Sequence, residues 1–399
     1  MVQDGQHRKS FKQAKHRIRT TTGDFVNKRL DYTDLRILEA IGTESPRNLS
    51  SVAKKLGIKE STMYSRLRRL KQLIFLNINI YHTFIGLRKG CVIAKAVQGK
   101  EKPLFDCMKA NDYWLYLFRY YGESEGCFAV YAIPPENQPE FESFVEMLEL
   151  KGIAQNTEIF WSTCFHTVNP TTNWYDEKSE EWLFPWNQWM KEMEHETTEL
   201  PYTLIDPVGF PQKADYTDIF ILKELEIDAT KTLKSIAATL ETSLQLIKYH
   251  FDKHIVRRKL LESYQVSSFP FQPEKADFFV LILTFPNKVN LAKFANSLFN
   301  KPFARTIGKI HGQNGLVVQI YLPRKEFRRL IDSLSILINS GILKSYRYLI
   351  QDLRHVARET IPYKLFNNGK WKYQSEKYLE EVRSILDGNE VSGQIPKET

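Results

Sequence analysis

The segment from residue 59 to residue 72 carries basic and hydroxyl side chains at a spacing that suits contact with nucleic acid. On a helix, Arg66 and Arg69 share a face with Thr62 and Ser65, opposite an apolar face. An arginine in a major groove can donate two hydrogen bonds to guanine, whereas lysine and hydroxyl groups suit phosphate oxygens. We therefore predict that double-stranded DNA is contacted by Lys59, Ser61, Thr62, Ser65, Arg66, Arg68 and Arg69. The alternative is that this basic cluster only solvates an exposed helix.

A second segment with weaker DNA-binding character follows near residue 250. Its predicted contacts are Lys248, Tyr249, His250, Lys253, Arg257, Arg258 and Lys259. Asp252 lies among them and would weaken phosphate binding. Two roles remain open for this segment: it grips the DNA backbone while the first segment reads bases, or it has a structural or partner-binding role.

The residues that support catalysis or metal binding in other proteins show no grouping here. Cys91, Cys107, Cys127 and Cys164 lack a C-x-x-C spacing, so no metal site is expected. The histidines are scattered, as at 166, 311 and 355, and the chain has no P-loop or dinucleotide fingerprint. We therefore expect no catalytic residues, no cofactor and no enzymatic activity.

The elements that would position the DNA-binding residues occur twice. "LDYTDLRILEAI" (30–41) and "ADYTDIFILKEL" (214–225) each begin a helix with a capping aspartate, Asp31 or Asp215. Two further short helices follow each one, with a tight turn before the third, which is the pattern of a helix-turn-helix. The β-prone segments at 73–82 and 259–268 are predicted to form the wings.

The repeat continues beyond the helices. After each third helix the pattern predicts strand, helix, two strands around a glycine-containing turn, helix and strand, which is the βαββαβ order of a ferredoxin-like domain. "FFVLILTF" (278–285) shows little alternation, so we expect a sheet covered on both faces. The predicted fold class is α+β, with two winged helix-turn-helix domains alternating with two ferredoxin-like domains as an internal tandem repeat.

These elements divide the chain into seven segments. The predicted boundaries are 1–29 (basic flexible arm), 30–85 (winged helix-turn-helix 1), 90–167 (ferredoxin-like domain 1), 168–213 (acidic Trp-rich helix and linker), 214–270 (winged helix-turn-helix 2), 276–354 (ferredoxin-like domain 2) and 355–399 (tail with an amphipathic helix). The tryptophans of 168–213 are expected to pack in a core, and the alternative is a surface for the transcription machinery.

Several of these motifs occur together in one family. Leu30, Asp31 and Asp34, then "SVAKKLGI" and "SRLRRL" (65–70), then a βαββαβ unit, resemble the Lrp/AsnC (feast/famine) transcription regulators. In that family the helix-turn-helix binds DNA, and the α/β domain dimerises and often senses amino acids. The resemblance therefore implies duplex DNA as a partner and leaves a small-molecule effector open.

The effector site of the family transfers weakly. There, the turn between the middle strands carries a glycine and an aspartate near the pocket, but the turns here read "GESEG" (122–126) and "HGQNG" (311–315). Gly122, Gly126, Gly312 and Gly315 are therefore weak ligand-binding candidates. The simpler interpretation is that they make hairpin turns.

The predicted function is sequence-specific binding of double-stranded DNA by a transcription regulator. The chain would act as a covalent pseudo-dimer, alone or as a homodimer, with the first helix-turn-helix as main reader. One alternative is a tetrapyrrole-modifying or ligand-binding protein, because siroheme decarboxylases share this architecture; they use His and Arg residues around the tetrapyrrole, and the sequence shows no such cluster. The other is an RNA- or protein-interaction module.

Charge and hydropathy favour a polyanionic partner away from membranes. The net charge is +9, and residues 1–30 hold eight Lys/Arg against two Asp. No apolar run is long enough to span a bilayer, and the basic start is not followed by the apolar run of a signal peptide. We expect a cytoplasmic protein without a membrane partner.

Overall fold

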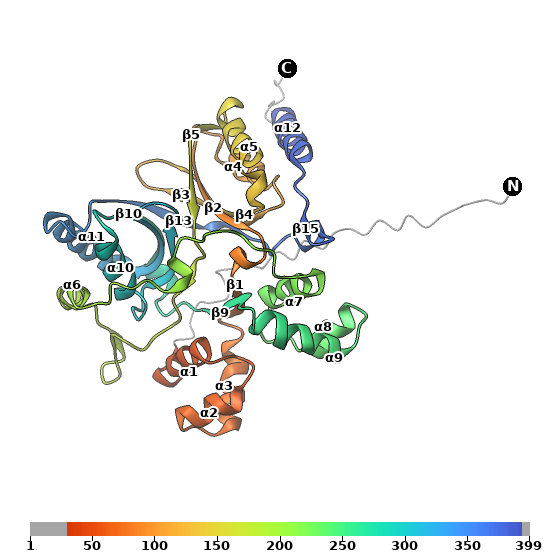
Figure 1. Cartoon of the computed structure of the whole chain (residues 1–399). Helices are drawn as coiled ribbons and strands as arrows, with labels where there is room; N and C mark the ends of the chain where they lie inside the picture. The colour runs from red at the N-terminus through yellow and green to blue at the C-terminus, as the bar shows by residue number, and fades with distance from the viewer. Residues whose placement is uncertain (1–29, 393–399) are drawn as a thin grey trace, which may run out of the picture.

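The computed structural model describes residues 30–392 and shows a mixed α/β protein with a helix-turn-helix region near its N-terminal end and a large sheet (Figure 1). The predicted basic arm, 1–29, lies outside the described residues, as do residues 393–399. Within 30–392, no helix combines the length and the apolar character needed to cross a bilayer.

Three short helices form the helix-turn-helix region at the start of the described chain. They are α1 (Tyr32–Thr43), α2 (Leu49–Leu56) and α3 (Glu60–Leu70). Asp31 caps α1 by accepting a hydrogen bond from the Asp34 N–H, and the Asp34 side chain accepts one from the Asp31 N–H in return. Gly57 ends α2 in the left-handed conformation, with φ of 68°. Met63, Leu67 and Leu70 of α3 are buried against α1 and α2, as the spacing predicts.

A second helical group has the same kind of start but a different third helix. It consists of α7 (Tyr216–Ile227), α8 (Leu233–Thr239), α9 (Leu244–Tyr249) and the π-helical segment η5 (His250–Val256) that continues α9. Asp215 and Asp218 form a capping box on α7. The π-helical turn adds one residue to the helix, so Ile255 rather than His254 takes the buried position after Phe251.

The strands that follow the two helical groups pair with one another. β1 (Phe75–Ile80) and β9 (Leu261–Ser267) form an antiparallel two-stranded ribbon, with Asn77 opposite Gln265. Each helical group contributes one strand here, and an unpaired strand leaves its backbone hydrogen-bonding groups unsatisfied. The segments expected to form separate wings therefore build one shared ribbon.

The large sheet has nine strands among the described residues and closes into a ring. Its order is β12-β10-β13-β3-β4-β2-β5-β11-β6, and β11 also pairs with β12. The bounds are β2 (Arg88–Ala96), β3 (Trp114–Tyr121), β4 (Gly126–Ile133), β5 (Ala154–Ser162), β6 (His166–Thr167), β10 (Ala276–Thr284), β11 (Ala304–Ile310), β12 (Gly315–Pro323) and β13 (Ser345–Arg358). Closure leaves few unpaired edges, which favours a single stable unit.

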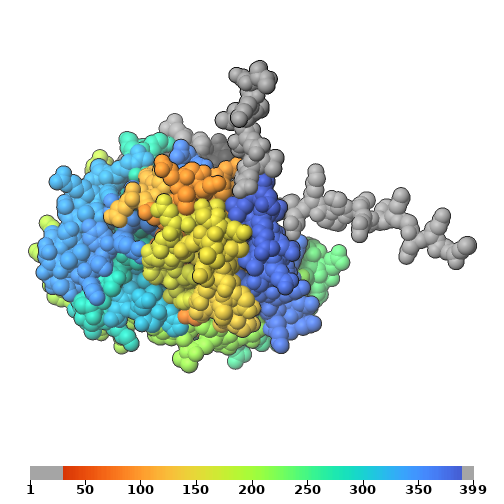
Figure 2. Space-filling model, turned by 90° about the horizontal axis from the view of Figure 1, so that it is seen from above, coloured from red at the N-terminus to blue at the C-terminus, as the bar shows by residue number. Residues whose placement is uncertain are grey.

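Helices cover the outside of this ring. The helices that pack on the strands are α4 (Glu101–Cys107), α5 (Gln138–Leu150), α10 (Lys288–Ser297) and α11 (Arg324–Asn339). Two more helices pack on these: α6 (Trp186–Glu194) lies against α10 and α11, and α12 (Ser375–Ser392) lies against α4 and α5. Seen from above, α12 in dark blue lies against the yellow α5 (Figure 2). Along β10, Leu281 and Leu283 face a helix-side core whereas Val280 and Ile282 face the ring interior. The sheet is thus covered on both faces, as the lack of alternation predicted.

The acidic segment after β6 packs onto the second half of the ring. Trp186 and Trp189 of α6 are buried, and their indole N–H groups donate to Glu326 and Ser297. This is the core packing expected for the aromatic residues of the segment. The remaining short elements are β7 (Tyr175–Asp176), β8 (Glu181–Trp182), β14 (Phe366–Asn367), β15 (Lys370–Trp371) and the 3-10 turns η2 (His82–Phe84), η3 (Pro135–Asn137), η4 (Tyr202–Leu204), η6 (Pro273–Lys275) and η7 (Tyr363–Leu365).

Candidate ligand-binding cavity and nucleic-acid surface

A cavity of about 250 Å³ lies between the β1–β9 ribbon and the inner side of the ring. We call it the central cavity. Its aromatic lining consists of Phe75, Tyr116, Phe128, Phe165, Phe269 and Phe278. Its ionisable lining consists of His82, Lys89, Glu226, Arg305, Arg358 and Glu359. Apolar walls with a few converging polar groups are typical of small-molecule sites.

Several buried polar atoms of the central cavity lack a hydrogen-bond partner. Among residues 30–392, nine buried side-chain atoms are in this state, and five of them belong to cavity-lining residues. These five atoms are Asn77 Oδ1, His82 Nε2, Thr167 Oγ1, Ser268 Oγ and Arg305 Nε. Burying a polar atom without a partner costs about 1–3 kcal/mol, so their concentration at one place indicates a site that a polar ligand completes.

His82 presents a lone pair to the cavity. Its Nδ1 lies 2.8 Å from the Ile80 carbonyl oxygen, which can only accept, so Nδ1 carries the proton. Burial, with a smaller effect from the charge of Lys89, holds the pKa of His82 well below its usual range. The neutral ring therefore leaves Nε2 as an acceptor at physiological pH.

Two buried cations face the same cavity. Arg305, on β11, donates from Nη2 to the Ser268 carbonyl oxygen at 2.7 Å, and burial lowers the pKa of its guanidinium to about 10, so it stays charged. Lys89, on β2, is 6% exposed and lies with Nζ 5.0 Å from the centre of the Phe165 ring. Neither cation forms a salt bridge with a carboxylate within the described part of the chain. Buried cations that lack a salt bridge favour an anionic ligand, although the charge of Lys89 also acts on Glu226 and Glu262.

Glu226 adds a proton-exchanging group. It lies near the end of α7, and its Oε2 accepts the Ile361 N–H at 2.9 Å. Burial raises the pKa of Glu226 to about 7, against the lowering effects of that hydrogen bond and of Lys89. A carboxyl with a pKa near the working pH can both give and take a proton. The cavity therefore combines buried cations, which suit an anion, with a carboxyl group that can exchange a proton.

The sequence did not reveal this grouping because its members lie on separate elements that are far apart in the chain. His82 follows β1, Lys89 lies on β2, Glu226 on α7 and Arg305 on β11. The available signal was a basic residue within or directly beside an apolar strand segment, as at Lys89 and Arg305. The prediction that His and Arg residues form no cluster is therefore wrong.

The predicted DNA-binding residues of α3 fall into two sets. Lys59, Ser61, Thr62, Ser65 and Arg68 are exposed. Arg66 and Arg69 are instead directed towards α1, where Arg66 Nη1 lies 2.7 Å from Asp31 Oδ2 and Arg69 pairs with the fully buried Asp34. Both guanidinium groups thus lie beside the capping box, although the Arg69 side chain stays 42% exposed. Lys59 and the exposed residues of α3 outside these ion pairs are the ones free to meet DNA.

The second set of predicted DNA-binding residues is also divided. Lys248, Tyr249, Lys253, Arg257, Arg258 and Lys259 are exposed. Of these, Arg258 donates to the Lys213 carbonyl oxygen at 2.7 Å. His250, expected on the outer face, is buried instead, because its Nδ1 lies 2.8 Å from Asp218 Oδ1.

The glycines predicted as weak ligand-binding candidates lie at turns away from the central cavity. Gly122 and Gly126 flank the β3–β4 turn, and Gly312 and Gly315 flank the β11–β12 turn. Gly312 has φ of 73°, which glycine adopts without strain. A Cβ on Gly126 would lie 2.1 Å from the Ala94 carbonyl oxygen, so packing explains this glycine.

The cysteines are buried and inert. Burial raises the pKa of Cys91, Cys107 and Cys164 to about 12, and that of Cys127 further. A thiol that stays protonated is a poor nucleophile and metal ligand.

The helix-turn-helix region matches a known family. Residues 30–73 match the family model described as winged helix-turn-helix DNA-binding. No curated protein matches the chain by sequence.

The solved structures similar to this chain include an enzyme. Siroheme decarboxylase NirDL superposes with a TM-score of 0.50 and 12% identity, over 89% of this chain and 98% of that chain. The structure of NirDL in co-complex with an iron-uroporphyrin III analogue superposes with a TM-score of 0.50 and 11% identity, over the same shares of the two chains. AsnC from E. coli superposes with a TM-score of 0.29 and 17% identity, over 34% of this chain and 92% of that chain. These identities show similarity of fold.

This similarity contradicts the expectation of no enzymatic activity. That expectation rested on the absence of grouped catalytic residues in the sequence. The similarity over 89% of the chain is to the fold of an enzyme. In addition, ionisable residues that are far apart in the sequence line one central cavity.

Proposed function

We propose that the protein binds a carboxylate-bearing tetrapyrrole in the central cavity and removes a carboxylate from it. The observation that carries the proposal is the convergence of five unpartnered buried polar atoms and two buried cations on one aromatic-walled cavity. A tetrapyrrole combines a flat apolar ring system with peripheral carboxylates, which complements this lining. The fold shared with siroheme decarboxylase NirDL supports the same ligand class.

The chemistry follows from the groups present. In decarboxylation the bond between the carboxylate carbon and its neighbour breaks, CO₂ leaves, and the remaining electron pair takes up one proton. Glu226 Oε2 accepts the Ile361 N–H, so Oε1 is the oxygen that can carry this proton. Its pKa of about 7 keeps a large protonated fraction at neutral pH. Arg305 and Lys89 hold the ligand's carboxylates.

Binding is tested first, with iron-uroporphyrin III as the probe and the shift of its Soret band as the readout. We expect saturable binding by the purified protein, weakened roughly 10- to 100-fold in Lys89→Met and Arg305→Met, because each loses a charge-assisted contact. Lys95→Met, on the same strand but exposed, is the matched control. Equal affinity of all four proteins would reject the cavity as the site.

Turnover is tested separately with siroheme, by mass spectrometry of the extracted product. The parent should release one CO₂ per carboxylate lost, whereas Glu226→Gln should bind the substrate but not convert it. Binding without any mass loss in the parent would leave a tetrapyrrole-binding protein and reject the decarboxylase.

We infer that DNA binding by the first helix-turn-helix is a second function. The match of residues 30–73 to a DNA-binding family favours it. So does the exposure of Lys59, just before α3, and of Ser61 and Arg68 on α3.

The order of elements supports the further proposal that the chain is a pseudo-dimer of two helix-turn-helix and ferredoxin-like units. Within each half the strand order is the same, β5-β2-β4-β3 and β13-β10-β12-β11. Such a chain would present its first helix-turn-helix as the main reader of duplex DNA.

A further inference from the structure

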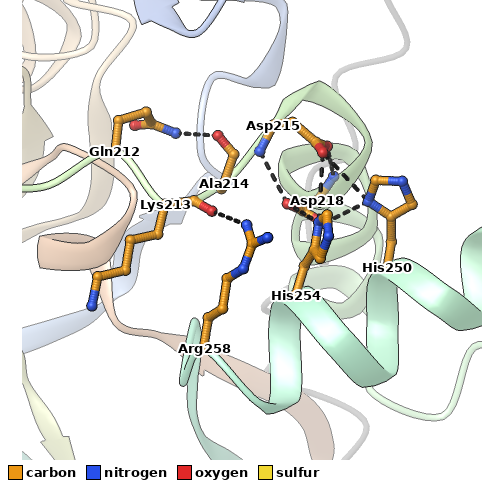
Figure 3. Close-up of polar contacts among 8 residues, drawn as sticks. All are labelled: Gln212, Lys213, Ala214, Asp215, Asp218, His250, His254 and Arg258. Atoms are coloured by element: carbon orange, nitrogen blue, oxygen red, sulfur yellow. Dashed lines mark hydrogen bonds and ion pairs between the residues drawn. The ribbon is translucent and has the colours of Figure 1, made fainter.

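Four potential metal ligands meet between the first and third helices of the second helical group. They are Asp215 and Asp218 at the start of α7, and His250 and His254 on η5 (Figure 3). Both imidazole Nδ1 atoms face the two carboxylates. The four ligand atoms all lie within 4.8 Å of one another. We call this group the His–Asp cluster.

The four distances between histidine and aspartate atoms of the His–Asp cluster are close to those of a tetrahedral ligand shell. His250 Nδ1 lies 2.8 Å from Asp218 Oδ1 and 3.5 Å from Asp215 Oδ2. His254 Nδ1 lies 3.1 Å from Asp218 Oδ2 and 3.6 Å from Asp215 Oδ2. Zinc bonds of about 2.0–2.1 Å place neighbouring ligands of a tetrahedral site about 3.3 Å apart. The observed distances bracket this value, so an ion could enter with small side-chain movements.

The first helical group provides a matched comparison. There the same capping box, Asp31 and Asp34, is paired with Arg66 and Arg69. Two guanidinium groups neutralise two carboxylates permanently and cannot bind a metal, because arginine has no free lone pair. In the second group both cations are replaced by imidazoles, which can be neutral donors of a lone pair.

The π-helical turn is what completes the ligand set. The offset of 184 that relates Asp31 to Asp215 and Arg66 to His250 would pair Arg69 with Lys253, not with His254. The extra residue of η5 turns Lys253 out to solvent and brings His254 to the carboxylates. π-Helical turns are rare and are frequent at functional sites. The local distortion thus places an imidazole, rather than a lysine, beside the two carboxylates.

We propose that the His–Asp cluster binds a divalent transition-metal ion, with Zn²⁺ as the best fit. Two imidazole nitrogens with two carboxylate oxygens suit Zn²⁺, whereas Mg²⁺ and Ca²⁺ prefer all-oxygen shells. The fully buried Asp218 supplies charge, and the half-exposed side chain of Asp215 gives the ion access from solvent. The bound ion fastens the third helix of this group to the first. In the first group, Arg66 and Arg69 make the equivalent link between the third helix and the first.

The test uses the full-length protein, stripped with EDTA and titrated with Zn²⁺, with calorimetry for stoichiometry and affinity. Co²⁺ is the spectroscopic probe, because tetrahedral nitrogen and oxygen coordination gives intense visible bands. We expect the parent to bind one equivalent more than the double variant His250→Arg/His254→Arg. That variant recreates the residue types of the first group, so it should fold, and thermal unfolding with and without Zn²⁺ checks this.

His355→Gln is the control, because His355 Nδ1 also lies 2.8 Å from an aspartate, Asp352, but has no second histidine beside it. It should bind Zn²⁺ like the parent. The proposal is overturned if the double variant retains the equivalent, or if the parent shows no tetrahedral Co²⁺ spectrum.

Discussion

Arg66 Nη1 lies 2.8 Å from Asp34 Oδ1, and the side chain of Asp34 is completely buried. The same nitrogen lies 2.7 Å from Asp31 Oδ2, so one guanidinium joins α3 to the capping box of α1. Burial works to raise the pKa of Asp31, but hydrogen bonds from Arg66 and the Asp34 N–H outweigh it and the net pKa is lowered. A residue type suited to reading bases is thus part of the internal structure of this helix-turn-helix.

Replacing Arg66 by alanine should therefore lower stability before it affects any partner. We expect the free energy of unfolding to fall by about 2–3 kcal/mol, because Asp34 stays buried and keeps only Arg69 as a cation. Arg68→Ala, two residues along the same helix and exposed, should change it by less than about 0.5 kcal/mol. Urea unfolding of the two variants measures the difference, and equal stabilities would contradict the structural role of Arg66.

Arg68 is the cleaner probe of DNA binding. Arg68→Ala should weaken binding to duplex DNA across all sequences and reduce the slope of affinity against salt by about 1, because one phosphate contact is lost. Lys288→Ala removes an equal charge from α10 and is the control. If both variants lose affinity alike, binding reflects net charge rather than α3.

Glu226 should make stability depend on pH. Its pKa of about 7 in the folded protein lies above the ordinary value of 4.5, so the folded state holds the proton more tightly than the unfolded state does. The contribution to stability is therefore complete at low pH and is lost as pH rises through about 7, at a cost of up to about 3 kcal/mol. Urea unfolding at about pH 5 and about pH 8 should show a smaller pH difference in Glu226→Gln than in the parent. An unchanged difference would show that Glu226 is not the titrating group.

Gly126 should act through packing rather than through a ligand. In Gly126→Ala the new Cβ would lie 2.1 Å from the Ala94 carbonyl oxygen, so we expect destabilisation by about 1–3 kcal/mol or more. Gly209→Ala is the control, because nothing lies within 4 Å of its Cβ position. Thermal unfolding compares the two. If Gly126→Ala is as stable as the parent but binds tetrapyrrole more weakly, Gly126 has a ligand-binding role instead.

Local patterns in the sequence determined the helices and the burial of the strands. The capping aspartates, the apolar spacing of α3 and the unbroken apolar run of β10 each act over a few residues, where propensity and solvent exclusion decide the outcome. These features allowed a helix-turn-helix within 30–85 and the doubly covered sheet to be predicted.

Tertiary structure alone decided which residues meet. The pairing of β1 with β9 joins segments far apart in the chain, and it encloses the cavity where His82, Lys89, Glu226 and Arg305 converge. One extra residue in η5 decided that His254 rather than Lys253 reaches Asp218. Such contacts depend on how whole elements pack and on the register of a single helical turn. No local pattern carries that information, because the interacting residues are neighbours only in space.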